Sequence, residues 1–439
     1  MKKLLPLFIT AALGSVSAAT WADSLTEIYD QAKQNDPQLL RAAAQRDRAF
    51  EAINSARATL LPQINLTAGY DFTRADYDFG DSDNLTAGVG FSQELYNRTS
   101  WITLDTAEKT ARQADSQYAA AQQSLILRTA QAYFEVLRSK DNLESVRANK
   151  AAVARQLEQT KQRFEVGLSA ITDVHDAQAQ YDRVLADEVV AENNLLNQYE
   201  ALREITGQEH NNIDVLDTDR FAAARPEQDV NFFLEEAQSK NLDLLSARIG
   251  QDIAKDNITL ASSGHLPKLT LDGGYGYDNE RNSDSQRVRQ GNDTTNVFNA
   301  GINLSIPLYT GGNITSQTRQ AEFAYVEASE QLEQTYRSVV RNVRANNNNI
   351  NSSIGAIRAF EQTVISAESA LEATKAGFDV GTRTIVDVLE ATQALYDAES
   401  NLSDARYDYI VSVLNLRQSV GTLSEQDIID INAGLKKAN

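Results

Sequence analysis

The chain has 439 residues, a formal net charge of −20 at pH 7 and no cysteine. A chain of this length can bury a core without covalent cross-links, and the lack of Cys excludes a disulfide framework, thiol chemistry and Cys-ligated zinc. The acidic balance argues against nucleic acid as a partner, because phosphates demand a basic face.

The first 22 residues have the pattern of a secretory signal peptide. Lys2 and Lys3 precede an apolar stretch over 4–13, and small residues follow up to Ala22, so we expect cleavage before Asp23. After this segment no run approaches the roughly 20 apolar residues that a membrane helix needs. Any membrane crossing by the mature chain must therefore be made by strands.

The first half, 23–208, reads as helix, β-hairpin, long helix and return helix. Asp36-Pro37 marks a helix start, and apolar and polar residues alternate in both arms of a hairpin over 63–96. About 65 residues without Pro then predict one long helix. The return helix ends at Gly207 as a left-handed cap.

The second half, 230–421, repeats this order after an aperiodic linker over 209–229. Its hairpin covers 268–309 and its return helix ends at Gly421, before a polar tail over 422–439. The offset between matching motifs is 267−62 = 205 at Leu-Pro and 378−164 = 214 at the Phe-containing motif. The chain therefore predicts an internal two-fold repeat.

The strands and helices together predict a membrane α+β fold. Each strand is apolar on one face and polar or Gly-rich on the other, which is typical of a barrel wall around a wet lumen. Four strands cannot close into a barrel alone. Two copies of the chain would give eight strands, and three copies would give twelve. Helices of about 65 residues would be on the order of 100 Å long, so we expect them to continue the barrel as an antiparallel coiled-coil tube.

Two stretches, FEVGLSAITDVHDAQAQYD from Phe164 and FDVGTRTIVDVLEATQALYD from Phe378, resemble the TolC family. The resemblance runs from about Leu25 to Ile429. It implies a homotrimer with a 12-stranded barrel in the outer membrane of a Gram-negative bacterium and a helical tunnel in the periplasm. It further implies an exit duct for tripartite multidrug efflux pumps and type I secretion. The implied partners are an inner-membrane transporter of RND, ABC or MFS type, a periplasmic adaptor protein and outer-membrane lipid.

The candidate site is the pair of turns that join each long helix to its return helix. Gly167 and Gly381 supply the backbone freedom of a tight turn, and Asp173, Asp387 and Glu390 follow where a helix start favours carboxylates. These acids could simply stabilise the helices. In a ring of copies, each acid would instead become several close like charges.

The resemblance assigns roles to residues around these turns. It places Asp387 and Glu390 in an acidic ring at the entrance, which selects cations and can bind blocking metal ions. It makes gate links of four residues: Thr172, Asp173, Phe378 and Arg383. The family usually has Asp where this chain has Glu390, so we expect this carboxylate to reach further. A close relative has Tyr where this chain has Phe378, so we expect one hydroxyl of the gate to be missing.

Two other classes of function compete with the duct. An enzyme is disfavoured because the chain has only three His, none at a metal or catalytic spacing, and no phosphate loop; we therefore expect no catalysis, no cofactor and no required metal. The second is a non-conducting periplasmic coiled-coil scaffold or adhesin anchored in the outer membrane. It shares the helices but does not require two matched hairpins with lipid-compatible strands.

Overall fold

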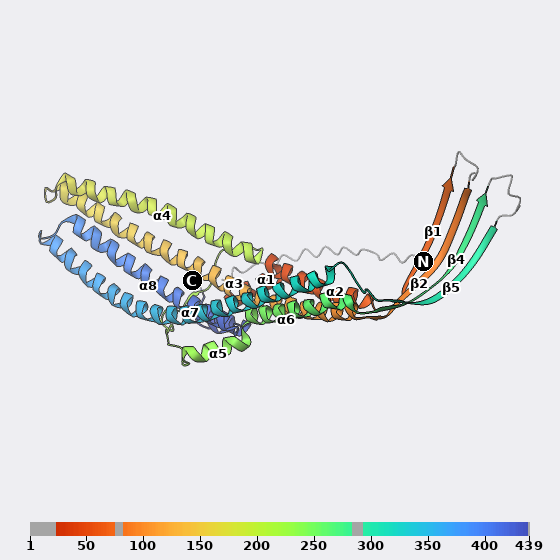
Figure 1. Ribbon diagram of the computed structural model, residues 1–439. Helices are drawn as coiled ribbons and strands as arrows, with labels where there is room; N and C mark the ends of the chain where they lie inside the picture. Colours follow the sequence, from red (N-terminus) through yellow and green to blue (C-terminus); the bar gives the residue numbers. More distant parts are fainter. Residues whose placement is uncertain (1–22, 75–81, 283–292, 438–439) are drawn as a thin grey trace.

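The computed structural model describes residues 23–74, 82–282 and 293–437. It is a long, slender molecule with a four-stranded sheet at one end and helices along the rest (Figure 1). The predicted signal peptide, most of the first hairpin turn and the middle of the second hairpin loop lie outside the described residues.

The elements follow the same order in both halves. The first half contains α1 (Leu25–Asn35), α2 (Pro37–Ala58), β1 (Gln63–Thr73), β2 (Ser82–Asn97), α3 (Arg98–Glu165) and α4 (Ile171–Thr206). The second half contains α5 (Val230–Lys240), α6 (Leu242–Ser262), the short 3-10 helix η1 (Ser263–His265), β4 (Lys268–Asn282), β5 (Asp293–Ser305), α7 (Asn313–Asp379) and α8 (Ile385–Val420). Three short elements complete the fold: β3 (Val215–Leu216), α9 (Glu425–Asn432) and β6 (Leu435–Lys436).

Two offsets, one near 214 and one of 205, separate the matching helices. The first residues of α8 and α4 differ by 385−171 = 214 and the last ones by 420−206 = 214, while α5 and α1 differ by 230−25 = 205 and α6 and α2 by 242−37 = 205. A residue of one half therefore has a definite counterpart in the other.

Local sequence fixes where the helices begin and end. The Asp36 side chain accepts a hydrogen bond from the backbone N–H of Leu39, with Pro37 as the first helical residue. Gly207 and Gly421 end the return helices with φ of 71° and 89°, the left-handed region that favours glycine.

The four strands form one antiparallel sheet in the order β1-β2-β4-β5. Its register aligns Leu66, Val89, Tyr275 and Phe298 in one row across the sheet. Because opposed residues share a face, one face of the sheet is apolar, and these four side chains are partly or largely exposed on it.

The opposite face of the sheet is polar and small. The neighbouring row consists of Asn65, Gly90, Gly274 and Asn299. Nearer the helices, Ser92 Oγ donates a 2.6 Å hydrogen bond to Asp272 Oδ1 on this face. The sheet thus separates an apolar surface from a polar one, as the alternation in the sequence predicted.

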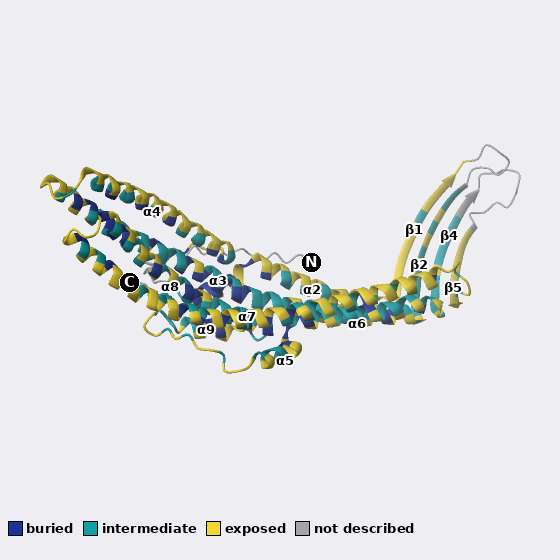
Figure 2. Cartoon of the chain, turned by 60° about the vertical axis from the view of Figure 1, so that its left-hand side comes forward, coloured by how far each residue is buried: buried dark blue, intermediate teal, exposed yellow. Residues whose placement is uncertain are grey.

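The long helices α3 and α7 run the length of the helical part, and each is flanked by two shorter helices. The helices α2 and α4 pack on α3, and α6 and α8 pack on α7 (Figures 1 and 2). α3 also contacts α6 and α8, which joins the two halves into one curved layer.

The largest apolar cluster lies at mid-length of the helices. Tyr133 and Phe134 of α3 are buried there against Tyr407 of α8. The burial colours in Figure 2 place most of the buried residues in the helical part and few in the sheet. Among the described residues, no helix is long and apolar enough to cross a membrane.

The C-terminal segment, expected to be a polar tail, is folded against this cluster. The β6 strand pairs with β3 in the segment between the halves. In α9, Asp427 and Ile428 are 3% and 1% exposed, and Arg417 of α8 forms an ion pair with Asp427. The polar composition of the segment hid these contacts, because its few apolar residues do not form a periodic pattern.

Candidate functional site

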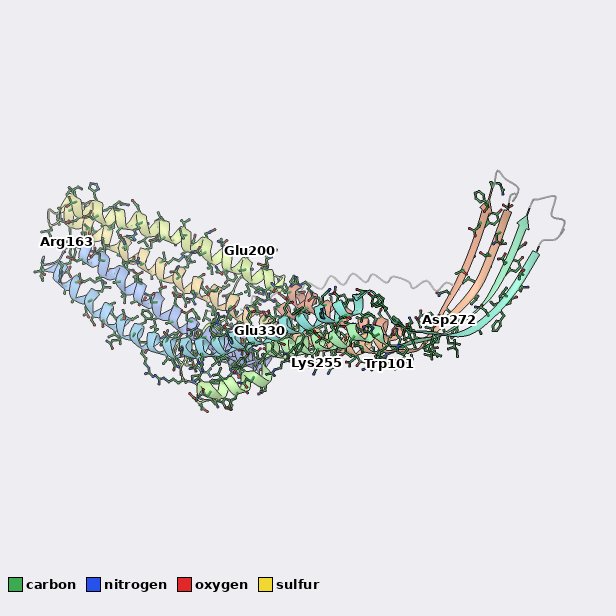
Figure 3. All side chains as sticks on the ribbon, viewed as in Figure 1. Trp101, Arg163, Glu200, Lys255, Asp272 and Glu330 are labelled. Carbon is green, nitrogen blue, oxygen red and sulfur yellow. The ribbon has the colours of Figure 1, made fainter. Side chains whose placement is uncertain are left out.

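The two turns with the predicted site residues lie together at the end of the molecule opposite the sheet (Figure 1). One joins α3 to α4 and the other joins α7 to α8. The label of Arg163 in Figure 3 marks this end, and that of Asp272 marks the base of the sheet. About one full helix length therefore separates the candidate site from the strands.

Glycine makes both turns possible. Gly167 and Gly381 have φ of 78° and 79°, where a side chain would be strained. The N–H of Gly167 donates to the carbonyl of Phe164 at 2.9 Å, and that of Gly381 donates to the carbonyl of Phe378 at 3.1 Å. The helices therefore end and reverse within a few residues.

Asp173 and Asp387 both cap the return helices. Asp173 Oδ2 accepts hydrogen bonds from Ser169 Oγ at 2.7 Å and from the N–H of Ala170 at 3.2 Å. Asp387 Oδ2 accepts from the N–H of Thr384 at 2.8 Å and from its Oγ1 at 2.9 Å. Each carboxylate thus has a local structural role.

The charge of Asp387 is favoured by its surroundings. The backbone N–H and then the hydroxyl of Thr384, with a smaller effect of the Arg383 charge, hold the pKa of Asp387 below its usual value. Hydrogen bonds to a carboxylate stabilise its ionised form. Asp387 therefore carries its negative charge throughout the neutral range.

Phe378 lies inside the helical end. It is 9% exposed and packs in a cluster with Val153, Leu371 and Leu389 from three helices. The Arg163 guanidinium carbon lies 4.7 Å from the centre of its ring, close enough for a cation–π interaction. Phe378 thus ties α7 to α3 and α8.

Arg383 and Thr172 are exposed at the tips of the two turns. The Arg383 side chain lies over Gly377, where an added Cβ would stand 2.8 Å from its Cγ. Within the described part of the chain, the guanidinium of Arg383 has no hydrogen-bond or ion-pair partner. In the described part of the single chain, neither Thr172 nor Asp173 forms a hydrogen bond or ion pair with Arg383, so the gate links remain a prediction.

Glu390 lines an open groove between α4 and α8. The groove measures about 550 Å³, and its other charged residues are Asp176, Arg183 and Asp397. Glu390 is exposed. It is therefore free to reach a neighbouring charge, whereas Asp387 is held by its cap.

A second groove of about 300 Å³ lies between α3 and α7, with Arg155, Gln159, Lys375 and Asp379 among its lining residues. Groups of His, Cys, Asp and Glu that could hold a metal ion were not found among the described residues. The turns thus combine charged grooves with structural carboxylates.

Sequence reasoning missed two features of this site. It did not assign Thr384 and Ser169 as capping partners, although a Ser or Thr three residues before an Asp is a known capping signal and Thr384 precedes Asp387 by that spacing. It also missed Arg163, whose contact with Phe378 joins positions 215 residues apart (378−163 = 215). No local signal could have found that pair.

The sequence model of a family described as outer membrane efflux protein matches residues 28–208 and again 233–422. The chain is 70% identical over 438 residues to the outer membrane protein TolC of Vibrio cholerae serotype O1, with 100% of both chains covered. It is 28% identical to the alkaline protease secretion protein AprF of Pseudomonas aeruginosa, covering 98% of this chain and 90% of that protein.

A solved structure shares the fold. The crystal structure of the CmeC outer membrane channel of Campylobacter jejuni matches with a TM-score of 0.78 and 17% identity, over 99% of this chain and 98% of that one. At this identity the likeness concerns the fold alone. By its full-length sequence matches, this chain belongs to the outer membrane efflux protein family, as TolC does.

Proposed function

We propose that copies of this outer-membrane protein close into one continuous duct, the exit for tripartite multidrug efflux pumps and for type I secretion. More specifically, we propose that the duct is a homotrimer. Three copies would supply a 12-stranded barrel, and their helices would form a periplasmic tunnel.

The sheet carries this proposal. Its apolar face is exposed along all four strands, and among the described strands β1 and β5 each have an unpaired edge. An unpaired backbone edge in hydrocarbon costs several kcal/mol per group. Pairing β5 of one copy with β1 of the next removes both edges and turns the apolar face to lipid.

The helices support the same closure. Among the described helices, α7, which follows β5, lies at one edge of the layer, and α2, which precedes β1, lies at the other edge together with α4 (Figure 1). A ring that closes the sheet therefore also closes the helical layer. With 68 residues in α3, the resulting tube would extend on the order of 100 Å beyond the barrel.

We further propose that the two halves, 23–208 and 230–421, are copies of one unit. The double match of the family model and the two recurring helix offsets support this. Each half then supplies two strands, one full-height helix and one column of two shorter helices to the wall. The segment 209–229 links the halves.

At the entrance, Asp387 and Glu390 would form rings of negative charge that attract cations. Repetition of a charged groove around an axis concentrates field and cations there. Thr172, Asp173 and Arg383 would form the links between helix pairs that hold the entrance closed. Phe378 would support these links from within, because it packs α7 against α3 and α8.

The partners of the proposal are an inner-membrane transporter of RND, ABC or MFS type and a periplasmic adaptor. The grooves beside Glu390 and between α3 and α7 are the kind of surface that accepts helical partners. The relative named for alkaline protease secretion supports export of proteins as one use of the duct.

The gate is tested by the substitution Arg383→Ser. Loss of a hydrogen bond to a charged group costs roughly 1.5–3 kcal/mol, which should ease opening in each copy. We expect a higher single-channel conductance in planar bilayers than for the unchanged protein. Unchanged conductance would remove Arg383 from the gate.

The alternative is a non-conducting scaffold or adhesin anchored in the outer membrane. The exposed apolar face on all four strands fits a membrane anchor in the duct and in this alternative alike. Light scattering of the detergent-purified protein tests the duct against this alternative. A mass of three chains is the expected result, and a stable monomer would contradict the duct.

A further inference from the structure

The backbone of Asp23, the first described residue, is fixed on both sides. Asp23 forms an isolated parallel bridge with Ile213, in the segment between the halves. Its N–H donates to the carbonyl of Asn212 at 3.0 Å, and its carbonyl accepts from the N–H of Asp214 at 3.3 Å. Ile213 belongs to the main apolar cluster and is fully buried. Asp23 is therefore attached to the core of the molecule before the first helix begins.

The side chain of Asp23 is anchored as well. Its Oδ2 lies 2.8 Å from Nδ1 of His210, whose side chain is 1% exposed. Nε2 of the same ring lies 3.0 Å from Oγ1 of Thr206, the last residue of α4. Because a carboxylate only accepts hydrogen bonds, Nδ1 of His210 is the donor to Asp23. Asp23 thus connects, through His210, to the end of α4.

The chain is packed tightly from Asp23 onward. Ser24 caps α1: its N–H donates to Glu27 Oε2 at 3.0 Å, and its Oγ accepts from the N–H of Glu27 at 3.2 Å. Leu25 is fully buried in the main cluster. The helix α1 contacts α3, α4 and α9 (Figure 1). The nitrogen of Asp23 is therefore the point at which the preceding segment joins a closely packed region.

A buried acid flanks Asp23 across the bridge. Asp214 is 8% exposed, and its Oδ1 has no hydrogen-bond partner among the described residues. Burial raises the pKa of Asp214 above its usual value; the Lys437 charge opposes this shift, and the charges of Glu27 and Asp23 add to it. A buried carboxylate oxygen without a donor is unfavourable, more so beside like charges. This position would be stabilised by a further positive donor.

Cleavage at the expected end of the signal peptide would supply such a donor. Hydrolysis of the amide between Ala22 and Asp23 by a signal endopeptidase adds one water across the C–N bond. Ala22 leaves with a carboxylate, and Asp23 keeps an amine that is mostly protonated at neutral pH. The amide nitrogen has one hydrogen, which the Asn212 carbonyl accepts. The ammonium has three, so cleavage adds two donors and a positive charge at this point.

We propose that the protein contains a docking site for its own new amino terminus. The Asn212 carbonyl and the Asp214 carboxylate accept from the α-ammonium of Asp23, and His210 holds the Asp23 side chain. Cleavage before Asp23 completes this site, and the new charge compensates the buried acid. Removal of the signal peptide thereby stabilises the junction of α1, the end of α4 and the segment between the halves. The site lies within one chain, so it does not depend on the proposed duct.

Protection of the amine tests the site without changing any of its residues. Intact-mass measurement of the protein purified from membranes should give a chain that begins at Asp23. An acetylating ester at neutral pH modifies α-amines ahead of lysines, whose usual pKa is about 10.4 against about 8 for an α-amine. We expect it to modify Asp23 severalfold more slowly than the terminus of a control with Ser-Gly-Ser inserted between Ala22 and Asp23. Mass measurement shows that both chains are cleaved after Ala22.

The inserted residues move the amine away from Asn212 and Asp214 and leave all side chains of the site in place. A docked amine is therefore withheld from the reagent only in the chain that begins at Asp23. Equal rates of acetylation in the two folded proteins would overturn the proposal, and so would a natural chain that begins at another residue.

The role of Asp214 is tested by Asp214→Asn in both chains. In the chain that begins at Asp23, this substitution should remove the protection of the amine and lower the thermal unfolding midpoint. In the chain with the insertion it should change the midpoint much less, because the ion pair is already absent there.

Lys437→Gln is the matched control, since Lys437 is the other cation that acts on Asp214. It should leave the amine protected. If Asp214→Asn lowers the midpoint equally in both chains and leaves the amine protected, Asp214 does not hold the terminus and the proposal is wrong. These readouts concern single chains, so their failure leaves the duct untouched, and a stable monomer in light scattering would leave the docking site untouched.

Discussion

At the level of single residues, the helix-start acids do two things at once. Asp387 accepts two hydrogen bonds from Thr384 and is still partly exposed, whereas Glu390, three residues later, is exposed and lines a groove. Asp387 therefore combines a fixed charge with a capping role, and Glu390 supplies a charge with freedom to move. In a ring of copies, Asp387 would supply a constant negative electrostatic field. Glu390 could move to contact a bound cation.

The cap predicts a pH dependence. Because hydrogen bonds from Thr384 lower the pKa of Asp387 in the folded chain, its contribution is present above the usual Asp value of about 3.9 and is lost as pH falls through the lowered value. In Asp387→Asn, the amides in the first turn of α8 should exchange hydrogen severalfold faster at neutral pH. This difference should vanish in strong acid.

Glu390→Gln is the matched control for this measurement, since Glu390 lies in the same helix without a hydrogen-bond partner among the described residues. Exchange of the first turn should be unchanged in it. Equal exchange in Asp387→Asn and the unchanged protein at neutral pH would show that the carboxylate does not cap the helix.

At the level of elements, the ends of the return helices differ although their sequences look alike. Gly207 and Gly421 are both left-handed. A Cβ at Gly421 would lie 2.3 Å from the carbonyl oxygen of Lys240, whereas one at Gly207 would lie 3.5 Å from the Cβ of Asn35. The end of α8 is thus packed directly on the junction between α5 and α6.

Gly421→Ala should therefore destabilise the protein more than Gly207→Ala. Both substitutions impose the left-handed strain of about 1–2 kcal/mol, but only the first also forces a steric clash. Thermal unfolding of the two variants in detergent, followed by circular dichroism, checks the order. Equal unfolding midpoints for the two variants would mean that the α5–α6 junction can shift to accommodate the added methyl group without loss of stability.

The folded C-terminal segment makes a second prediction at this level. Ile428 is 1% exposed and belongs to the main cluster, while its neighbour Ile429 is 49% exposed. Ile428→Ala should cost about 2–5 kcal/mol, as for other buried large-to-small changes. Ile429→Ala is the control and should change stability little. Matching midpoints for the two variants would mean that α9 does not pack on the core.

The secondary-structure elements also show which features could be predicted from the sequence and which could not. Alternation gave the strands and their faces, because a two-residue period is local, and the paired Phe-Gly motifs gave the turns. The pairing of β3 with β6 joins Val215 to Lys436, and two-residue strands leave no periodic signal. The cation–π contact of Arg163 with Phe378 was equally out of reach, since it depends on how two distant helix ends pack.

At the level of the whole molecule, every proposed role depends on closure. Among the described residues, the single chain has two open sheet edges and an exposed apolar face. One operation, a ring about the long axis, satisfies both. The same operation converts single acids at the turns into rings of charge at one end of a tube.

The predictions for the whole molecule came from two sources. The patterns in the sequence predicted membrane-spanning strands and long helices. They did not decide whether the barrel has eight or twelve strands. The family resemblance supplied the duct and the outer membrane, and the 70% identity to a TolC protein agrees with it. The number of copies depends on the curvature of the closed wall, which no local pattern encodes.

Single-channel recording of the purified protein in planar lipid bilayers tests the closed duct most directly. The account predicts discrete, long-lived conductance steps, with cation preference and block by di- or trivalent cations from the side of the acidic turns, weakened in Glu390→Gln. Preparations that insert into the bilayer yet never conduct, with or without added cations, would contradict it.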